Sequence, residues 1–180
     1  YWFTQKFLFD SLNWLKAGPA GVKLNYALTR LMEKVIGLII KESAAVVKLI
    51  EFVHFPVIRL LACFGFSGLT TQLMLVLDVF RLITVHIAMI HRIMYFQNWV
   101  LSEMIKSLFL LFRGKKSNIL RHRVDTIGYD SKQHLFGTVL FSMLLFLYPT
   151  FLAYYLLFTF LHLCIGLLQF MIWLLVVGLR

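Results

Sequence analysis

The stretch that decides the fold runs from Gln133 to Leu179 and reads QHLFGTVLFSMLLFLYPTFLAYYLLFTFLHLCIGLLQFMIWLLVVGL. These 47 residues contain no Asp, Glu, Lys or Arg, whereas a helix that crosses a membrane needs about 20 apolar residues. We therefore predict two transmembrane helices joined by a tight turn, near Leu135–Leu157 and Phe158–Gly178. Pro149 falls inside the first of them, where a proline bends a membrane helix without ending it.

The composition of the whole chain agrees with a protein that lies in lipid. Hydrophobic residues make up 61% of the chain and charged residues 14%, against about 45–50% and about 25% in soluble domains. These values argue against most soluble enzymes, and they exclude intrinsic disorder, which requires low hydrophobicity. The 18 Phe, 7 Tyr and 4 Trp residues suit a chain with aromatic side chains at bilayer interfaces.

The charge balance points to a membrane surface. The formal net charge is +10, from 18 Lys and Arg against 8 Asp and Glu, and in an apolar chain this excess favours contact with anionic lipid. Nucleic acid is a weaker interpretation, because the basic residues lie between hydrophobic segments. Cys63 and Cys164 are far apart in apolar runs, so neither a disulfide framework nor a zinc site is indicated.

A first transmembrane hairpin is predicted upstream, over residues 46–96. Its apolar arms are Val46–Phe64 and Leu69–Tyr95, and the glycines between them break the pattern. Asp78 and Arg81 lie three residues apart in the second arm, so they can form an intramembrane ion pair on one helix face. Such a pair is costly in a bilayer and usually faces protein or water.

The fold class expected is therefore all-α, a polytopic membrane protein with two transmembrane helical hairpins plus amphipathic interfacial helices. The interfacial stretches are Tyr1–Lys16 and Asn98–Phe112, with Asn98 as the helix N-cap. We expect one membrane-embedded helical domain over 1–180: interfacial helices in 1–45, the first hairpin in 46–96, a cytosolic helix and basic loop in 97–132, and the second hairpin in 133–180. The chain opens at Tyr1 without Met, so a fragment of a longer protein is expected.

Two groups of basic residues are candidate binding surfaces. On the helix expected for Val22–Glu51, five of them fall within roughly 40° of one another: Lys23, Arg30, Lys34, Lys41 and Lys48. A solvated stripe fits this pattern, and so does a docking face for an acidic partner helix or anionic lipid. The second group lies between the two hairpins: Arg113, Lys115, Lys116, Arg121 and Arg123.

The positive-inside rule places this second group, the basic loop, in the cytosol. With two hairpins, both ends of the chain then lie on the cytosolic side as well. The simplest interpretation of the basic loop is an orientation signal. The alternative is contact with a phosphoinositide headgroup or a diphosphate, because Arg and Lys suit phosphate oxygens.

No residue pattern predicts catalysis, a metal site or a cofactor. The run Gly114–Ser117 is similar to a phosphate-binding loop, but Phe109 stands where that motif needs its first glycine. Asp125 and Asp130 are five residues apart, not the Asp-x-Asp pair of many metal-dependent glycosyltransferases. The histidines in apolar segments have no carboxylate cluster beside them, which favours buried, hydrogen-bonded roles: His86, His91 and His162.

A long ordered string of residues nevertheless resembles a known family. The string begins with Arg113–Asp125, RGKKSNILRHRVD, and is preceded upstream by Pro19–Asn25, PAGVKLN. It continues through Tyr129-Asp130, Gln133, Gly137-Thr138, Leu140-Phe141, Pro149-Thr150 and Tyr154-Tyr155. This order resembles the membrane core of the subunit Q family of phosphatidylinositol N-acetylglucosaminyltransferase.

The resemblance implies a role in the first step of glycosylphosphatidylinositol-anchor synthesis. That complex moves N-acetylglucosamine from UDP-N-acetylglucosamine to phosphatidylinositol on the cytosolic face of the endoplasmic reticulum. In the family, the glycosyltransferase fold belongs to the catalytic A subunit, whereas the Q subunit is a multispanning partner that assembles or stabilises the complex. The implied partners are the catalytic A subunit, the C, H, P and Y subunits, and membrane lipids including phosphatidylinositol.

Three functions remain open from the sequence. The first is a non-catalytic membrane scaffold of this transferase, in the endoplasmic reticulum membrane. The second is direct participation, with the basic loop holding the lipid substrate or the diphosphate. The third is a small membrane transporter or lipid scramblase, which would favour ionisable residues converging at the bilayer midplane.

Overall fold

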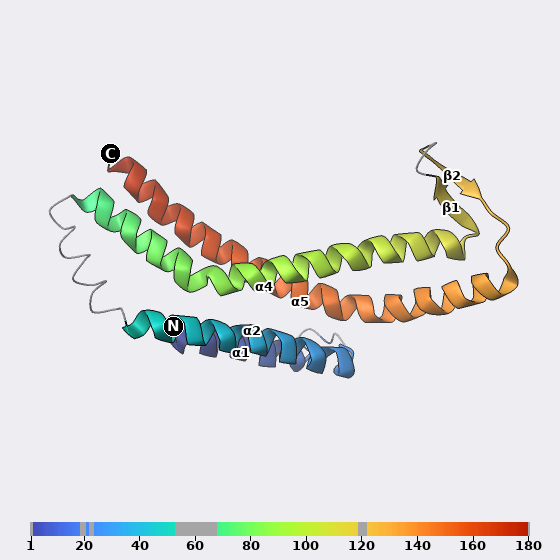
Figure 1. The fold of residues 1–180 in the computed structure, drawn as a ribbon, viewed down its shortest axis with the longest axis horizontal. Coiled ribbons are helices and arrows are strands. Elements are labelled where there is room, and N and C mark those ends of the chain that lie inside the picture. The colour runs from blue at the N-terminus through green and yellow to red at the C-terminus, as the bar shows by residue number, and fades with distance from the viewer. Residues whose placement is uncertain (1, 19–20, 22–23, 53–67, 119–121, 180) are drawn as a thin grey trace.

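The computed structural model describes residues 2–18, 21, 24–52, 68–118 and 122–179. The chain is mostly helical (Figure 1). Its elements in order are α1 (Trp2–Lys16), α2 (Tyr26–Phe52), α4 (Leu69–Phe112), β1 (Lys115–Asn118), β2 (Arg123–Thr126) and α5 (Ser131–Gly178).

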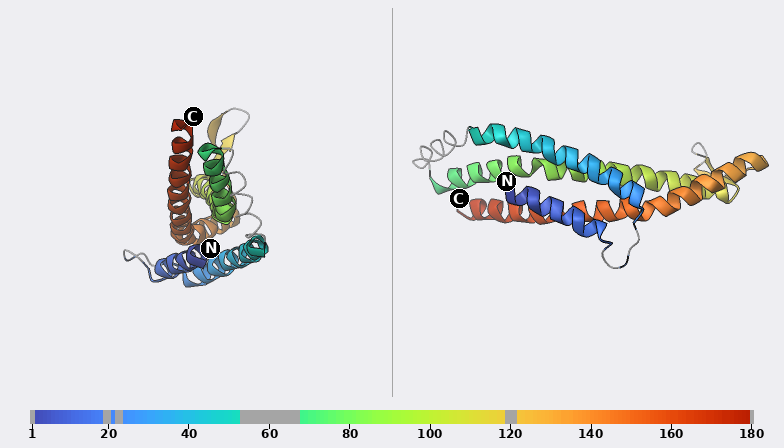
Figure 2. Two further views of the ribbon diagram at one scale, coloured as in Figure 1. Left: turned by 90° about the vertical axis from the view of Figure 1, so that its left-hand side faces the viewer. Right: turned by 90° about the horizontal axis from the view of Figure 1, so that it is seen from below.

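Helices α4 and α5 form one long antiparallel hairpin, with the two strands at the end where they are joined (Figures 1 and 2). They contain 44 and 48 residues, so at 1.5 Å per residue each is about twice as long as the ~30 Å hydrocarbon core of a bilayer. Both are long and apolar enough to cross a membrane. Both also bend near their middles (Figure 1), and α5 contains Pro149, which removes one helical hydrogen bond.

The second transmembrane hairpin expected over 133–180 is wrong. No turn occurs near Leu157 and Phe158, because α5 is one continuous helix from Ser131 to Gly178. The sequence around that point contains no glycine, proline or asparagine to end a helix. Because α4 is nearly as long, a continuous α5 has a partner along most of its length. The C-terminal end of α5 and the β-strands consequently lie at opposite ends of the molecule (Figure 1).

The separate interfacial helix expected over Asn98–Phe112 is also wrong. Asn98 lies inside α4 and its backbone carbonyl accepts a 2.8 Å hydrogen bond from the Ser102 hydroxyl. The expected restart at Leu69 is confirmed, since α4 begins there after Gly68. The first arm of the hairpin expected over 46–96 was Val46–Phe64. Its start belongs to α2, which ends at Phe52, and residues 53–64 lie outside the described residues.

Helix α2 begins later than the expected Val22, at Tyr26, because Asn25 caps it. The Asn25 Oδ1 atom accepts a 3.1 Å hydrogen bond from the Leu28 amide, which satisfies one of the free N–H groups at a helix start. Helices α1 and α2 lie side by side and antiparallel (Figure 2). Lys16 of α1 and Glu33 of α2 form an ion pair of 3.2 Å between them.

The α1–α2 pair packs against the middle of the α4–α5 hairpin, and the core lies where the four helices meet (Figure 1). Each helix contributes apolar side chains spaced three or four residues apart, as one face of a helix requires. The core residues are Leu8, Leu12, Leu15, Met32, Ile36, Ile40, Ile87, Ile90, Met94, Tyr154, Phe158 and Leu161.

The expectation of an all-α chain is corrected at residues 115–126, where β1 and β2 pair antiparallel. Helix α4 ends at Phe112, and Gly114 follows with a φ of 66°, the left-handed conformation that commonly ends helices. The Gly114 carbonyl then accepts a 3.1 Å hydrogen bond from the Ile127 amide. This bond closes the base of the strand pair, so the helix end and the hairpin form one unit.

Candidate functional site

The N-terminus of α2 is joined to the middle of α5 by a hydrogen bond. The Asn25 backbone N–H donates to the Thr150 Oγ1 atom at 3.0 Å, across 125 residues of sequence. Both residues belong to the strings that carry the family resemblance, and the structure brings those strings together. This contact was not predicted from the sequence. The available signal was that both residues belong to the stretches that resemble the family. The contact joins the start of α2 to α5.

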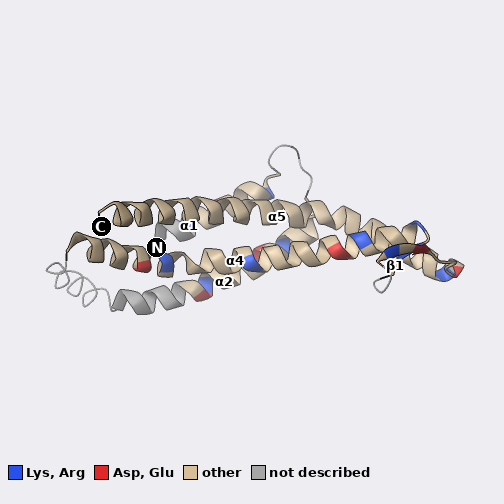
Figure 3. Cartoon of the chain, turned by 90° about the horizontal axis from the view of Figure 1, so that it is seen from above, with Lys and Arg blue, Asp and Glu red and all other residues tan. Residues whose placement is uncertain are grey.

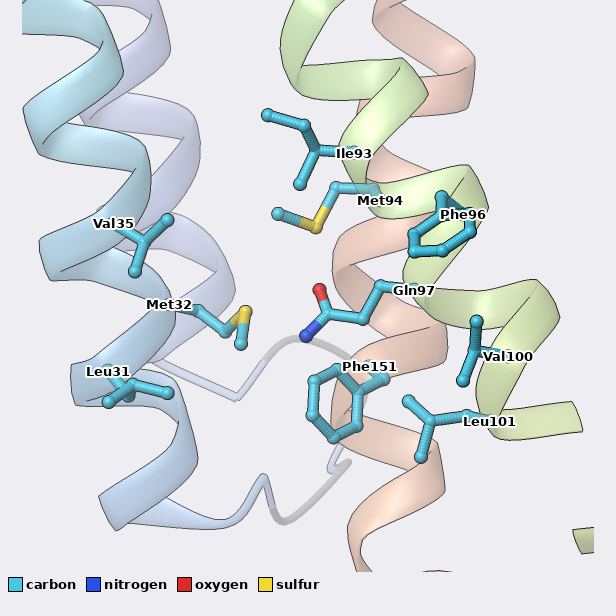
Figure 4. Close-up of a pocket in the computed structure, with 10 residues that line it drawn as sticks. All are labelled: Leu31, Met32, Val35, Ile93, Met94, Phe96, Gln97, Val100, Leu101 and Phe151. Carbon is cyan, nitrogen blue, oxygen red and sulfur yellow. The ribbon is translucent and has the colours of Figure 1, made fainter. Parts of the chain in front are cut away.

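An apolar groove lies between α2 and α4 and is closed at its base by α5 (Figure 4). Its volume is about 540 Å³. Helix α2 contributes Leu31 and Val35, α4 contributes Ile93 and Gln97, and α5 contributes Phe151. Figure 4 shows the Gln97 amide between the two helices. The sequence interpretation missed this groove, because its residues look like ordinary core positions of separate helices.

The basic residues of α2 face away from the helix contacts. The described side chains among them, Arg30, Lys34 and Lys41, are all exposed. Lys48 lies in α2, but its side chain is outside the described residues. Lys23 precedes the helix and also lies outside the described residues. A shared outward face is thus observed for three of the five residues.

The basic loop forms part of the strand pair. Asp125 accepts hydrogen bonds from Arg123 Nε at 2.7 Å and from Asn118 Nδ2 at 2.9 Å, and Lys116 stands opposite Asp125 in the register. These side chains share one face of the strand pair, since alternate residues of a strand point the same way. One carboxylate therefore faces two basic residues there.

The other basic residues of this loop have different surroundings. Lys115 lies on the second face, opposite Thr126. Arg113 is exposed, and its guanidinium carbon lies 5.7 Å from the centre of the Phe109 ring, within the range of a cation–π contact. Arg121 lies outside the described residues. The loop therefore presents positive charge at the end of the α4–α5 hairpin (Figure 3).

The charged residues of α4 lie along one face. Arg81 Nη1 lies 3.4 Å from Asp78 Oδ1, with side chains 55% and 70% exposed. Further along the helix, Lys106 Nζ lies 2.7 Å from Glu103 Oε1, and Arg92 is exposed between the two pairs. At about 100° per residue, all five side chains fall within roughly 80°. Helix α5, in contrast, carries no charged residue beyond its first turn (Figure 3).

Polar side chains also meet between α4 and α5. Gln169 Nε2 donates a 3.2 Å hydrogen bond to Thr84 Oγ1, and the His91 and His162 rings stack with centroids 4.5 Å apart. A small cavity of about 190 Å³ lies beside Thr84, Gln169 and Arg81. Hydrogen bonds of this kind hold membrane helices together, so these residues join the two helices.

Within the described ranges, no group of three or more His, Cys, Asp or Glu side chains is placed to hold a metal ion. The four ion pairs described above are formed by side chains that are exposed or half-exposed. The arrangement offers surfaces for binding: an apolar groove, a charged face on α4 and a basic strand pair.

Comparisons with known proteins give a consistent family. The protein family described as N-acetylglucosaminyl transferase component (Gpi1) matches residues 1–179 of the chain. The chain is 40% identical over 169 residues to phosphatidylinositol N-acetylglucosaminyltransferase subunit Q of Homo sapiens, covering 92% of this chain and 22% of that protein. It is 35% identical over 144 residues to the N-acetylglucosaminyl-phosphatidylinositol biosynthetic protein gpi1 of Schizosaccharomyces pombe, covering 79% and 22%.

A third relative is phosphatidylinositol N-acetylglucosaminyltransferase subunit GPI1 of Saccharomyces cerevisiae, 32% identical over 164 residues, covering 85% of this chain and 26% of that protein. No solved structure matches the chain significantly. The chain spans only 22% to 26% of the length of these three relatives. Because the family match extends over nearly every residue, the chain belongs to the Gpi1 family of N-acetylglucosaminyl transferase components.

Proposed function

We propose that this chain is the membrane core of a non-catalytic scaffold subunit in a complex that transfers N-acetylglucosamine to phosphatidylinositol. The transferred group and the lipid are taken from the names of its relatives. UDP-N-acetylglucosamine as donor, the A, C, H, P and Y subunits as partners, and the endoplasmic reticulum membrane as location are parts of the same proposal. Catalysis is assigned to the A subunit.

The observation that carries the proposal is the structural role of the family motif. The Thr150 hydroxyl accepts a hydrogen bond from the Asn25 amide, and Tyr154 is fully buried in the core. A side chain at position 137 would overlap Leu111 of α4, so Gly137 allows the two helices to approach closely. In the loop, Asp125 holds Arg123 and Asn118. These motif residues join helices and strands to one another, as expected of a subunit whose task is to hold a shape.

The charged face of α4 supports contact with other subunits. Ionised side chains on an apolar helix are costly in lipid and usually face protein or water. Asp78 and Arg81 are more than half exposed on a helix able to cross a membrane. A neighbouring transmembrane helix with polar side chains would cover them, and the long apolar surface of α5 would face lipid or a second partner.

The proposed topology differs from two hairpins with both ends in the cytosol. Here α4 and α5 each cross the membrane once. The strand pair lies in the cytosol, because Lys and Arg concentrate there, and the C-terminal end of α5 lies on the lumenal side. In sealed microsomes, a single cysteine at Ser117 should react with an impermeant maleimide, and one at Gly178 only after permeabilisation. Reaction at both positions without permeabilisation would place both ends of α5 in the cytosol and contradict a single crossing by this helix.

The scaffold role is tested by separating the amount of complex from its activity. Full-length protein with Arg121→Ala and Arg123→Ala would be expressed in cells lacking the wild type, and the complex purified through its catalytic component. We expect a lower yield of complex with normal transfer per catalytic component. A wild-type yield with transfer per complex reduced more than tenfold would instead assign the basic loop to substrate contact.

A further inference from the structure

The groove between α2 and α4 has the composition of a site for a hydrocarbon chain. Its volume of about 540 Å³ falls within the range of ligand sites, about 300–1,000 Å³. Leu31, Val35, Ile93 and Phe151 line it with apolar surface (Figure 4). Leu31 and Val35 are 54% and 40% exposed, so the groove is open along α2 and a chain can enter from the side.

One polar group lies inside this apolar lining. The Gln97 amide is turned toward the space between α2 and α4 (Figure 4), and it makes no hydrogen bond to another described residue. A partly buried amide without a hydrogen-bond partner destabilises the folded state. The ester carbonyl of a glycerolipid is an acceptor that matches it, and this group joins the acyl chain to the headgroup.

Positive charge stands beside the apolar lining on α2. Lys34 lies one helical turn from the groove-lining Leu31, and Arg30 lies one turn from Lys34. Both basic side chains are exposed. Neither forms an ion pair with a described residue, whereas Lys16, at the neighbouring end of α1, is neutralised by Glu33. These two cations are therefore available to an anionic group at the rim of the groove.

We propose that this groove binds one acyl chain of an anionic glycerophospholipid, with the lipid phosphate on Arg30 and Lys34. The hydrogen bond between Asn25 and Thr150 holds α2 in the position that forms the site. The inference deepens the proposed function, because it gives the chain direct contact with a lipid of the substrate's chemical class. The cations supply selectivity for anionic over neutral lipid, and the groove supplies the place where the lipid is held.

The test measures bound lipid directly, without activity. The complex containing the full-length protein would be placed in phosphatidylcholine nanodiscs with a minor fraction of phosphatidylinositol, and its retained lipid counted by native mass spectrometry. We expect Arg30→Gln with Lys34→Gln to lower retained phosphatidylinositol about tenfold. The matched control is Lys41→Gln, which removes an exposed cation further along the same face and should change nothing.

A second set of variants tests the groove itself. Val35→Trp should fill it and remove the lipid at wild-type complex yield, and Leu31→Trp repeats this at a second exposed position. The control is Leu38→Trp, since Leu38 is 60% exposed and does not line the groove. Retention of the lipid in both filled variants would overturn the proposal, as would its displacement by soluble inositol phosphate.

A photoreactive amino acid at position 35 separates a lipid from a protein occupant. We expect a crosslink to phosphatidylinositol in the assembled complex. A crosslink to another protein of the complex would make the groove a protein interface and overturn the lipid proposal, while leaving the scaffold function intact. The scaffold proposal fails if the Arg121→Ala, Arg123→Ala complex forms at wild-type yield with impaired transfer. The lipid proposal fails on the lipid counts and crosslinks described here, so the two proposals fail separately.

Discussion

The middle of the molecule and its strand-bearing end are built from the same two long helices but are held together differently. In the middle, four helices meet, and Tyr154 and Phe158 are completely enclosed. At the end, α4 and α5 are the only described helices in contact, through ring pairs such as Phe109 with Phe141 at 5.9 Å and Phe112 with Phe141 at 5.7 Å. The difference teaches that folding stability is concentrated in the middle, while the end presents the basic strands. Substitutions should therefore lose their effect on stability from the middle to the tip.

The largest effect is expected in the four-helix core. Phe158→Ala should lower the free energy of unfolding by about 3–5 kcal/mol, because it removes a buried ring and leaves a cavity. The measurement is thermal unfolding of the purified protein in mild detergent. Phe160→Ala on the same helix, where the ring is 64% exposed, is the control and should change stability little. Equal losses in the two variants would contradict a core at this position.

A smaller loss is expected where α4 and α5 approach each other near the strands. A Cβ atom at Gly137 would overlap the Leu111 side chain, so Gly137→Leu should cost about 1–3 kcal/mol through overpacking. Gly166→Leu in the same helix is the control, because a Cβ there has no neighbour within 4 Å. If the control variant unfolded at the lower temperature of the two, the close approach at Gly137 would not exist.

The bond between α2 and α5 should contribute less again. Thr150→Val removes the acceptor of the Asn25 amide, which we expect to cost about 1 kcal/mol. Thr159→Val is the comparison, since the buried Thr159 hydroxyl has no hydrogen-bond partner among the described residues and its replacement should be neutral or slightly stabilising. If the bond contributes to stability, the melting temperature of Thr150→Val will be lower than that of Thr159→Val.

The smallest effect on global stability belongs to the strands. Asp125→Asn weakens the contacts to Arg123 and Asn118, and ion pairs this exposed contribute about 0–1 kcal/mol. We expect an unchanged melting temperature but faster hydrogen exchange at residues 115–126. Asp130→Asn is the control, because the Asp130 side chain makes no capping bond to α5. Exchange that stays slow after Asp125→Asn would show that backbone pairing alone holds the strands.

The helical class, the start of α4 and the ion pair between Asp78 and Arg81 could be predicted from the sequence, because each depends on local spacing. The second hairpin was mispredicted because the number of spans was derived from the length of the apolar run. That length fits two crossings or one very long helix equally well, and the choice depends on the partner α4. The sequence contained the deciding signal, since nothing near Leu157 can end a helix.

The strands and the groove were missed for a different reason. Residues Lys115–Asn118 are all polar and lack the alternation that marks a half-buried strand, so only pairing with Arg123–Thr126 makes them a strand. The groove depends on how α2 lies against α4 and α5, which involves contacts between residues as far as 125 positions apart in sequence. Helical periodicity identifies faces, but it does not say which faces meet.

The contact between Asn25 and Thr150 also sets an order for biosynthesis. With 125 residues between its two partners and translation at about 5–20 residues per second, Thr150 is made roughly 6–25 seconds after Asn25. During that interval the core side chains of α2, such as Ile36 and Ile40, lack the α5 residues Tyr154, Phe158 and Leu161 that complete their cluster. The four-helix core is therefore completed only once the middle of α5 has been synthesised, although two of its helices are the first to be made.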